Sequence, residues 1–450
     1  YYATLPVLRL CGAHNRAEAT ETMFRVVPVC FGIATLALLW LLRDTLGPWG
    51  LIWAAAFGAI SNALVFYSRY YIQESLFAFF AFAAMVFGCR YVRKPSLGWA
   101  VAAGVALGLT HATKETCVVL YAAMTGAFAV TWLAAAWRAE GGLRGAFVRT
   151  WRAAHPWYIV VGLLAGVFVS VLFFSSFFTY WRGPLDSILT YTTYAHRAEG
   201  AGSTGLHDKP WYYYLALLFY TYRDAGPRWT EGFVVLLAGI GIAVAWRWRK
   251  NKPEPAQEAL SPVHFQRFLA LYALLTLAAF SVIPYKTPWN VVPFLQPLTV
   301  LAGIGAATLL AWPRRRWIKA ILLAGLLAGQ AHAARQTCLS NFRYDADPRN
   351  PYVYAHTSTA LLRLVERVKA IAAIAPEKND MLIAVFQPDG DYWPLPWYFR
   401  AYPKTGYWPK IPNGFERLPF IIADPRLRPE LWETLKDTHH FETYSLRPSV

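Results

Sequence analysis

Long and almost uncharged stretches recur between Phe24 and Ala334. A helix crosses the hydrocarbon core of a bilayer with about 17–25 predominantly apolar residues. Only helices and closed barrels satisfy their backbone polar groups inside lipid, so such stretches leave few alternative folds. We predict an α-helical, multi-pass membrane protein with about ten transmembrane helices, at Phe24–Leu42, Trp49–Tyr67, Ile72–Val92, Leu97–Thr113, Thr116–Trp137, Trp157–Phe178, Glu231–Trp248, Phe265–Ile283, Pro293–Trp312 and Ile318–Ala334.

The composition agrees with a membrane protein and excludes an ordinary soluble enzyme. Of 450 residues, 56% are hydrophobic and only 15% are charged, which departs strongly from the average soluble domain. The five cysteines show no CxxC spacing. Cysteines scattered through apolar segments behave as small hydrophobic residues, so they argue against a metal cluster and a disulfide framework.

Lysine and arginine gather in alternate loops, and cytoplasmic loops carry the excess of these residues. The basic loops contain Arg43; Arg90, Arg93 and Lys94; Arg138, Arg144, Arg149 and Arg152; Arg247, Arg249, Lys250 and Lys252; and Arg314, Arg315, Arg316 and Lys319. We predict that these loops are cytoplasmic and that the remaining loops lie on the extracytoplasmic side of the cell membrane. The net charge of +17 therefore reflects topology, and no basic, aromatic-interleaved motif indicates nucleic acid as a partner.

After Ala334 the long apolar stretches end, and the sequence shows the pattern of a small α/β domain. We predict two domains, a transmembrane domain over residues 1–334 and a small extracytoplasmic α/β domain over residues 335–450. The helices expected in the second domain are Thr357–Ala375 and Glu430–Lys436, and the buried strands are Met381–Phe386 and Phe420–Ala423. Asp380, Asp389 and Asp391 near the first strand fit turn and cap positions better than a catalytic site.

Five charged side chains lie at predicted outer ends of different helices: Arg69, Glu74, Lys114, Glu115 and Lys286. Each has an ordinary explanation, since basic side chains near helix ends extend to the interface and Glu115 can cap a helix or pair with Lys114. Taken together, however, the cations lie in three short outer turns at one face. Cations at headgroup depth suit a phosphate or pyrophosphate, which they bind through charge-assisted hydrogen bonds.

The long outer loop between Thr179 and Thr230 adds further candidate residues. The segment "HDKPWYYYLALL" returns to the membrane with His207, Lys209 and Trp211. Its tyrosines, Tyr212 to Tyr214, fit interfacial anchors, although aromatic rings also stack on sugars and isoprenoid chains.

Several long motifs occur together in this chain: "FYSRYYIQESLF", "GLTHATKETC", "HDKPWYYYL", "IPYKTPWNVVPFLQPL" and "NPYVYAHTS…DYWPLPWYFR". In these motifs the sequence resembles the flippase-activity-associated family, a branch of the protein mannosyltransferase and aminoarabinose-transferase superfamily. The resemblance implies a GT-C fold and transfer of a sugar from a polyprenyl-phosphate carrier to a glycan, lipid or protein acceptor outside the cell membrane. It also implies that Arg69, Glu74 and Lys114 help to form the donor pocket.

Catalysis in that superfamily rests on an acidic residue in the first outer loop. Tyr1 to Glu21 offers only Glu18 and Glu21, which lie too near the next predicted helix to match the expected position. We therefore expect the catalytic acid upstream of Tyr1, in a missing N-terminal piece. No cofactor is indicated, although a divalent metal could supply part of the positive charge; no ligand cluster demands one.

Two alternative functions remain open: a flippase or transporter of lipid-linked glycans, and a noncatalytic partner that presents them. Transporters place polar residues and broken helices near the bilayer midplane, often in related halves. Here the charges collect at one edge and no internal repeat is found, which favours the transferase.

Overall fold

A computed structural model describes residues 2–137, 141–198, 207–246 and 262–446. The chain divides into two compact units. The helical unit contains Phe24–Asp345 and Arg349–Tyr352, and the terminal unit contains Tyr1–Met23, Ala346–Pro348 and Val353–Val450. Five of the basic residues used to predict the topology, Arg138, Arg247, Arg249, Lys250 and Lys252, lie outside the described residues.

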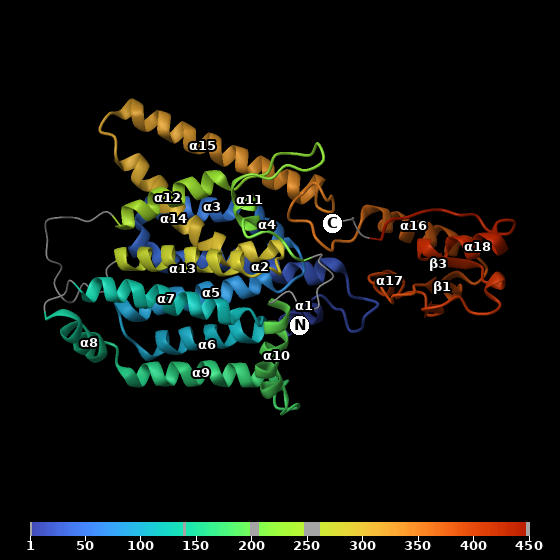
Figure 1. The fold of residues 1–450 in the computed structure, drawn as a ribbon, viewed down its shortest axis with the longest axis horizontal. Helices are drawn as coiled ribbons and strands as arrows, with labels where there is room; N and C mark the ends of the chain where they lie inside the picture. Colours follow the sequence, from blue (N-terminus) through green and yellow to red (C-terminus); the bar gives the residue numbers. More distant parts are fainter. Residues whose placement is uncertain (1, 138–140, 199–206, 247–261, 447–450) are drawn as a thin grey trace. The chain divides into compact units, whose positions relative to one another are not determined.

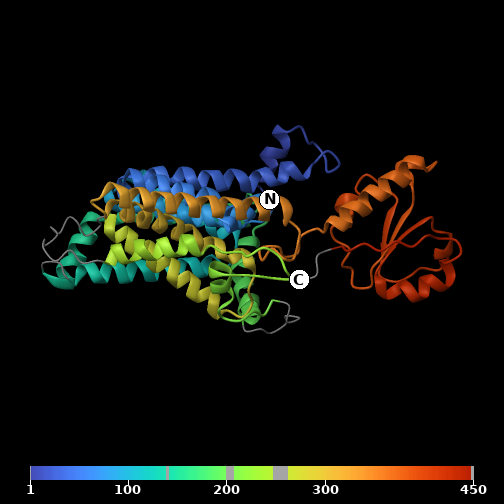
Figure 2. The same cartoon turned by 90° about the horizontal axis from the view of Figure 1, so that it is seen from above.

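The helical unit is a bundle whose long helices run roughly parallel, while α10 lies across one end and α8 lies at the other (Figure 1 and Figure 2). Its helices are α2 (Glu21–Leu38), α3 (Arg43–Ile60), α4 (Asn62–Arg69), α5 (Glu74–Arg93), α6 (Leu97–Thr113), α7 (Cys117–Ala136), α8 (Gly142–Ala153), α9 (Pro156–Phe174), α10 (Gly183–Ala198), α11 (Tyr213–Phe219), α12 (Gly232–Trp246), α13 (Pro262–Val282), α14 (Val292–Ala311) and α15 (Arg316–Cys338). Short helical segments in the described part of this unit include η1 (Leu39–Leu42), η3 (Pro288–Val291) and the π-helix η4 (Leu339–Arg343).

The prediction of a multi-pass helical membrane protein is confirmed. Within the described residues, seven helical segments are long and apolar enough to cross a membrane, and α6 and α12 are shorter apolar helices. The first of the seven, Glu21–Ile60, combines α2 and α3, but Gly47 has non-helical torsion angles (φ 67°, ψ 170°) and divides it. Every predicted span therefore overlaps a helix.

The core of the bundle is α14. Every residue from Val292 to Ala306 is buried, and α14 packs against α3, α5, α12 and α13. A helix that is apolar on all sides is buried by its neighbours, and Pro293 is tolerated because it lies in the first turn.

Helices α6 and α9 pack at very close range through glycines. A Cβ atom built on Gly104 would lie 1.8 Å from the carbonyl oxygen of Gly162, and one on Gly108 would lie 2.2 Å from that of Gly166. Both helices thus carry a Gly-xxx-Gly pattern at their contact, which lets two backbones approach in a membrane.

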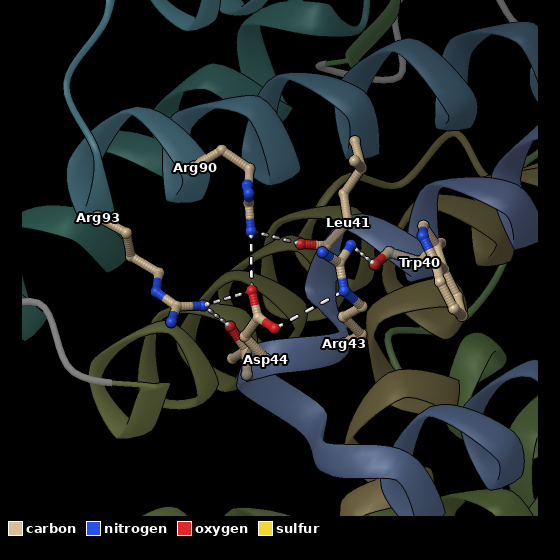
Figure 3. A network of polar contacts seen from close by, with 7 residues as sticks. Trp40, Leu41, Arg43, Asp44, Arg90 and Arg93 are labelled. Atoms are coloured by element: carbon tan, nitrogen blue, oxygen red, sulfur yellow. Dashed lines mark hydrogen bonds and ion pairs between the residues drawn. The ribbon is translucent and has the colours of Figure 1, made fainter.

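A network of arginines around Asp44 joins α3 to α5 at the end of the bundle opposite Glu74 (Figure 3). The Asp44 carboxylate lies 3.1 Å from Arg90 Nη1, 3.9 Å from Arg93 Nη1 and 3.8 Å from Arg43 Nε. Two of the predicted basic loops therefore meet at one end of the bundle.

The terminal unit contains a three-stranded parallel sheet in the order β2-β1-β3. Its strands are β1 (Ile383–Phe386), β2 (Thr405–Trp408) and β3 (Phe420–Ala423), and its helices are α1 (Thr4–Leu10), α16 (Thr359–Ile374), α17 (Leu395–Tyr398) and α18 (Arg428–Leu435). Ile383 pairs with Thr405 on one side and with Phe420 on the other. The predicted α/β fold is confirmed, but strand β2 was not predicted from the sequence.

The sheet is covered on both faces, as expected for parallel strands. Ile383 and Val385, whose side chains lie on one face of β1, pack with α16 residues such as Val368. The alternate set, Ala384 and Phe386, packs with Leu431 and Leu435 of α18. This alternation follows from the two-residue period of a strand.

Candidate functional site

The buried charges of the helical unit centre on Lys114 and Glu74. Lys114 follows the last turn of α6, and Glu74 begins α5. Lys114 Nζ lies 2.5 Å from Glu74 Oε1 and donates a second hydrogen bond of 3.0 Å to Asn290 Oδ1. The Glu74 side chain is 1% exposed and that of Lys114 is 7% exposed, so the pair is removed from water.

This pair keeps hydrogen-bonding capacity for a ligand. An ammonium group has three donors, and the contacts with Glu74 and Asn290 use two of them. Among the described residues, Glu74 Oε2 has no hydrogen-bond partner although it is buried. One donor and one acceptor suit a sugar hydroxyl, which both donates and accepts.

Asn290 links this pair to the turn that precedes α14. Its Nδ2 donates to the hydroxyl of Tyr214 at 3.4 Å, and that hydroxyl donates to the carbonyl of Thr287 at 3.0 Å. Tyr214, which the sequence analysis assigned to an interfacial group, is fully buried in α11. A tyrosine in that position is a structural member of the network and not an anchor.

Lys286 lies beside this network, between α13 and η3. Its side chain is 1% exposed, and Nζ donates to the carbonyl of Ile283. Burial lowers the pKa of the Lys286 ammonium from its ordinary value. The backbone N–H of Lys286 donates to the His207 carbonyl at 2.9 Å, and Lys209 N–H donates to the Pro284 carbonyl at 3.2 Å.

The structure therefore brings His207 and Lys209 against the Lys286 turn, from segments far apart in the sequence. The His207 ring lies 4.4 Å from that of Tyr285 between centroids. Burial, with a smaller contribution from Lys209, lowers the pKa of His207.

Arg69 makes its contacts with η4. It ends α4, and its Nη1 donates to the Asn341 carbonyl at 2.7 Å. Its guanidinium carbon lies 4.5 Å from the centre of the Phe342 ring, a cation–π geometry. Arg69 is thus held by the π-helix, while Lys114 is held by Glu74 and Asn290.

The remaining candidates have fewer contacts. Glu115 is partly buried, and its backbone carbonyl accepts from Cys117 Sγ at 3.7 Å. Trp211 is 67% exposed, as an interfacial residue would be. In the terminal unit, Glu18 accepts hydrogen bonds from His14 N and Asn15 Nδ2, and Glu21 accepts one from the Tyr398 hydroxyl.

Two polar residues of the helical unit were missed from the sequence. Asn290 lies within the quoted motif "KTPWN", where a polar residue in an apolar stretch was a usable signal. Glu231, at the start of α12, is 3% exposed, and its Oε1 accepts from Ser61 Oγ at 2.9 Å and Ala63 N at 3.0 Å.

An apolar cavity of about 940 Å³ lies among α5, α6, α7, α9, α10 and α13. Polar side chains that line it include His111, Ser170 and Tyr191. His111 Nδ1 lies 2.6 Å from Ser170 Oγ, and the Tyr191 hydroxyl lies 3.4 Å from Cys117 Sγ. His111 and Cys117 each lie three residues from Lys114 in the sequence.

No group of three or more His, Cys, Asp or Glu side chains is placed to hold a metal ion within the part of the chain that the structure describes.

Comparison with known proteins identifies the fold. Residues 6–185 match the family model of dolichyl-phosphate-mannose-protein mannosyltransferase. The crystal structure of ArnT from Cupriavidus metallidurans in the apo state is similar, with a TM-score of 0.54, 16% identity, and coverage of 96% of this chain and 83% of that one. The structure of ArnT from the same organism bound to undecaprenyl phosphate gives a TM-score of 0.52, 15% identity, and coverage of 99% and 85%. No curated protein sequence matches the chain.

The fold is thus that of the GT-C class of membrane glycosyltransferases. Residues 6–185 are similar to the protein mannosyltransferase family, and the fold of the chain is similar to that of ArnT. These findings confirm the expected GT-C fold and agree with the superfamily expected from the motifs, while the flippase-activity-associated branch stays a prediction.

Proposed function

We propose that this protein transfers a sugar from a polyprenyl-phosphate carrier to an acceptor on the extracytoplasmic side of the cell membrane. The observation that carries the proposal is the buried cluster of Glu74, Lys114 and Asn290 at one end of a GT-C bundle. Burial of charged groups is costly even when they are paired, and ionisable residues within membrane domains mark functional sites.

Arg69 is the residue best suited to the carrier phosphate. A guanidinium carries five N–H groups in a planar fork, so Arg69 can bind phosphate while it keeps its bond to Asn341. Lys209, on the segment paired with the Lys286 turn, is a second candidate cation. Lys114, already neutralised by Glu74, is better suited to orient a sugar hydroxyl together with that carboxylate.

The cavity beside α6 suits the apolar part of such a donor. Its walls are mainly apolar, as a polyprenyl chain requires, and His111, three residues before Lys114 in the sequence, is among the residues that line it. The related ArnT has been crystallised with undecaprenyl phosphate, and we extend that ligand class to this chain by proposal.

The reaction joins the acceptor oxygen to the anomeric carbon of the sugar and breaks the bond between that carbon and the phosphate oxygen. The phosphate leaves with the bonding electrons, and Arg69 stabilises its charge. A general base takes the acceptor proton, and we expect that base in the first outer loop. Residues that hold the donor lower the barrier by fixing its geometry.

The test measures release of polyprenyl phosphate from a labelled lipid-linked sugar by the full-length protein with an acceptor extract, beside equilibrium binding of undecaprenyl phosphate. Arg69→Gln should weaken binding about 10- to 150-fold, because it removes a charge-assisted contact. Arg69→Lys should also weaken it, since an ammonium lacks the bidentate fork.

The rival functions predict different results. Binding without release in the wild-type protein would favour a flippase or a presenting partner, the alternatives left open by the sequence. Release that does not depend on Arg69 would overturn the proposed phosphate site while the enzyme class would stand.

A further inference from the structure

Helix α4 begins at an abrupt change of backbone direction. Helix α3 ends at Ile60, and Ser61 has extended torsion angles (φ −60°, ψ 125°) before α4 starts at Asn62. The first N–H groups of a helix have no partner within it. Serine at this position usually accepts one of these N–H groups through its hydroxyl, but the Ser61 side chain makes no such bond.

Glu231 supplies the missing acceptor from the start of α12. Its Oε1 accepts from Ala63 N at 3.0 Å and from Ser61 Oγ at 2.9 Å. A carboxylate at the N-terminus of a helix is also stabilised by the helix dipole. Because Glu231 is 3% exposed, these contacts replace its hydration, as a buried acid requires.

Arg69 lies at the C-terminal end of α4. Buried hydrogen bonds also hold the part of the helix near Tyr67. The Tyr67 hydroxyl donates to the Tyr352 carbonyl at 3.0 Å, and Ser75 Oγ donates to the Tyr67 carbonyl at 3.0 Å. At only eight residues, α4 has little stability of its own. Its position therefore depends on its tertiary contacts, which include the bonds with Glu231 at its start.

We propose that Glu231 is a positioning residue for Arg69: it anchors the start of α4 and thereby sets where the guanidinium at the end of α4 meets the donor phosphate. The inference rests on the proposed function, in which Arg69 binds the carrier phosphate. Glu231 itself contacts neither sugar nor phosphate.

The experiment is a double-mutant cycle on the full-length protein, with equilibrium binding of undecaprenyl phosphate as the readout. Glu231→Ala should weaken binding about 3- to 30-fold, the range expected for loss of an N-terminal helix cap. Glu231→Gln retains a side-chain oxygen for Ala63 N–H and should bind within about threefold of the wild type. In an Arg69→Gln background, Glu231→Ala should cause no further weakening, because the residue through which it acts is gone.

Equal weakening by Glu231→Ala in both backgrounds would overturn the proposal and assign Glu231 a general structural role. If Glu231→Ala does not fold, the same cycle with Ser61→Ala decides, since that change removes one donor to Glu231 and no charge; coupling to Arg69 supports the proposal and additivity overturns it. If Arg69→Gln alone leaves binding unchanged, the phosphate site itself has failed, which is a separate outcome.

Discussion

Lys114 and Glu74 show that the role of a charged residue at a membrane edge is hard to predict when the residue is considered without its partner. Lys114 could extend to the interface on its own, as basic side chains near helix ends commonly do. Instead the two are buried against each other at 2.5 Å. Replacement of a buried ion pair by apolar residues is often neutral, whereas removal of one partner leaves an uncompensated charge.

The first prediction concerns this pair. Lys114→Met should lower the free energy of unfolding by about 3–5 kcal/mol, because the Glu74 carboxylate remains buried and unpaired. The double variant Lys114→Met, Glu74→Leu should recover most of that loss but lose donor turnover. Equilibrium unfolding in mixed detergent measures the first effect, and release of polyprenyl phosphate measures the second.

Lys94→Met is the matched control, since Lys94 is exposed at the other end of α5 and its loss should change stability little. A double variant as unstable as Lys114→Met would show that the pair stabilises the fold beyond charge neutralisation. A double variant with full turnover would remove Lys114 and Glu74 from the site.

At this scale the sequence indicated which charges to examine but not their partners. Arg69, Glu74, Lys114 and Lys286 were visible as charges at predicted helix ends. Their partners lie far away in the sequence: Asn290 is 176 residues from Lys114, and the Asn341 carbonyl is 272 residues from Arg69. No periodicity reports such pairings, because they depend on how helices pack.

Helices were the most predictable elements. Their lengths follow from the thickness of the bilayer, so α6 begins and ends where the sequence predicted, at Leu97 and Thr113. Strand β2 was missed because Thr405–Trp408 is only four residues long, partly exposed, and contains glycine, which is disfavoured in strands. The π-helix η4 was also missed, since its sequence differs little from that of the α-helix before it.

A prediction at the level of elements concerns the contact between α6 and α9. Gly104→Ala should lower the free energy of unfolding by about 1–3 kcal/mol, because the new methyl group would lie 1.8 Å from the Gly162 carbonyl oxygen. The two backbones would have to move apart, and a flexible side chain is not available to yield. Equilibrium unfolding in mixed detergent provides the measurement.

Gly98→Ala in the same helix is the control. A Cβ atom at Gly98 meets nothing within 4 Å, and alanine favours a helix over glycine by up to about 1 kcal/mol. The control should therefore be neutral or slightly stabilising. Equal destabilisation by both substitutions would mean that α6 and α9 do not rely on this close approach.

For the molecule as a whole, the membrane topology remains a prediction. The structure agrees with one part of it, since arginines from two loops predicted to be cytoplasmic lie together. Arg43, Arg90 and Arg93 meet at Asp44 (Figure 3), and α5 runs from Glu74 to this network. The positive-inside rule assigns the arginine end to the cytoplasm. The predicted division of the chain at residue 334 likewise remains a prediction.

Single cysteines in a chain without its five native cysteines test the orientation. Trp211→Cys and Asp391→Cys should react with a membrane-impermeant maleimide at the outer side of the cell membrane. Trp151→Cys, on exposed α8, should react only after that membrane is permeabilised. The reverse pattern would place the proposed site on the cytoplasmic side and overturn the assignment.

Membership of the terminal unit was the least predictable feature of the chain. The segment Tyr1–Met23 belongs to the same compact unit as Val353–Val450. Arg400 Nη2 donates to the Ala19 carbonyl at 2.9 Å, and the Tyr398 hydroxyl donates to Glu21 at 2.6 Å. Contacts between residues so far apart in the sequence produce no local sequence pattern from which they could be predicted.

The central position of α14 also sets the order in which the chain can assemble. Helix α3, which packs extensively on α14, ends at Ile60, whereas α14 begins at Val292. At about 5–20 residues per second, the ribosome needs roughly 10–50 s to proceed from one to the other. During that interval α3 resides in the bilayer with lipid in place of its main protein partner. Its insertion must therefore be stable without α14, and the core of the bundle is complete only after α14, which is synthesised late, packs against it.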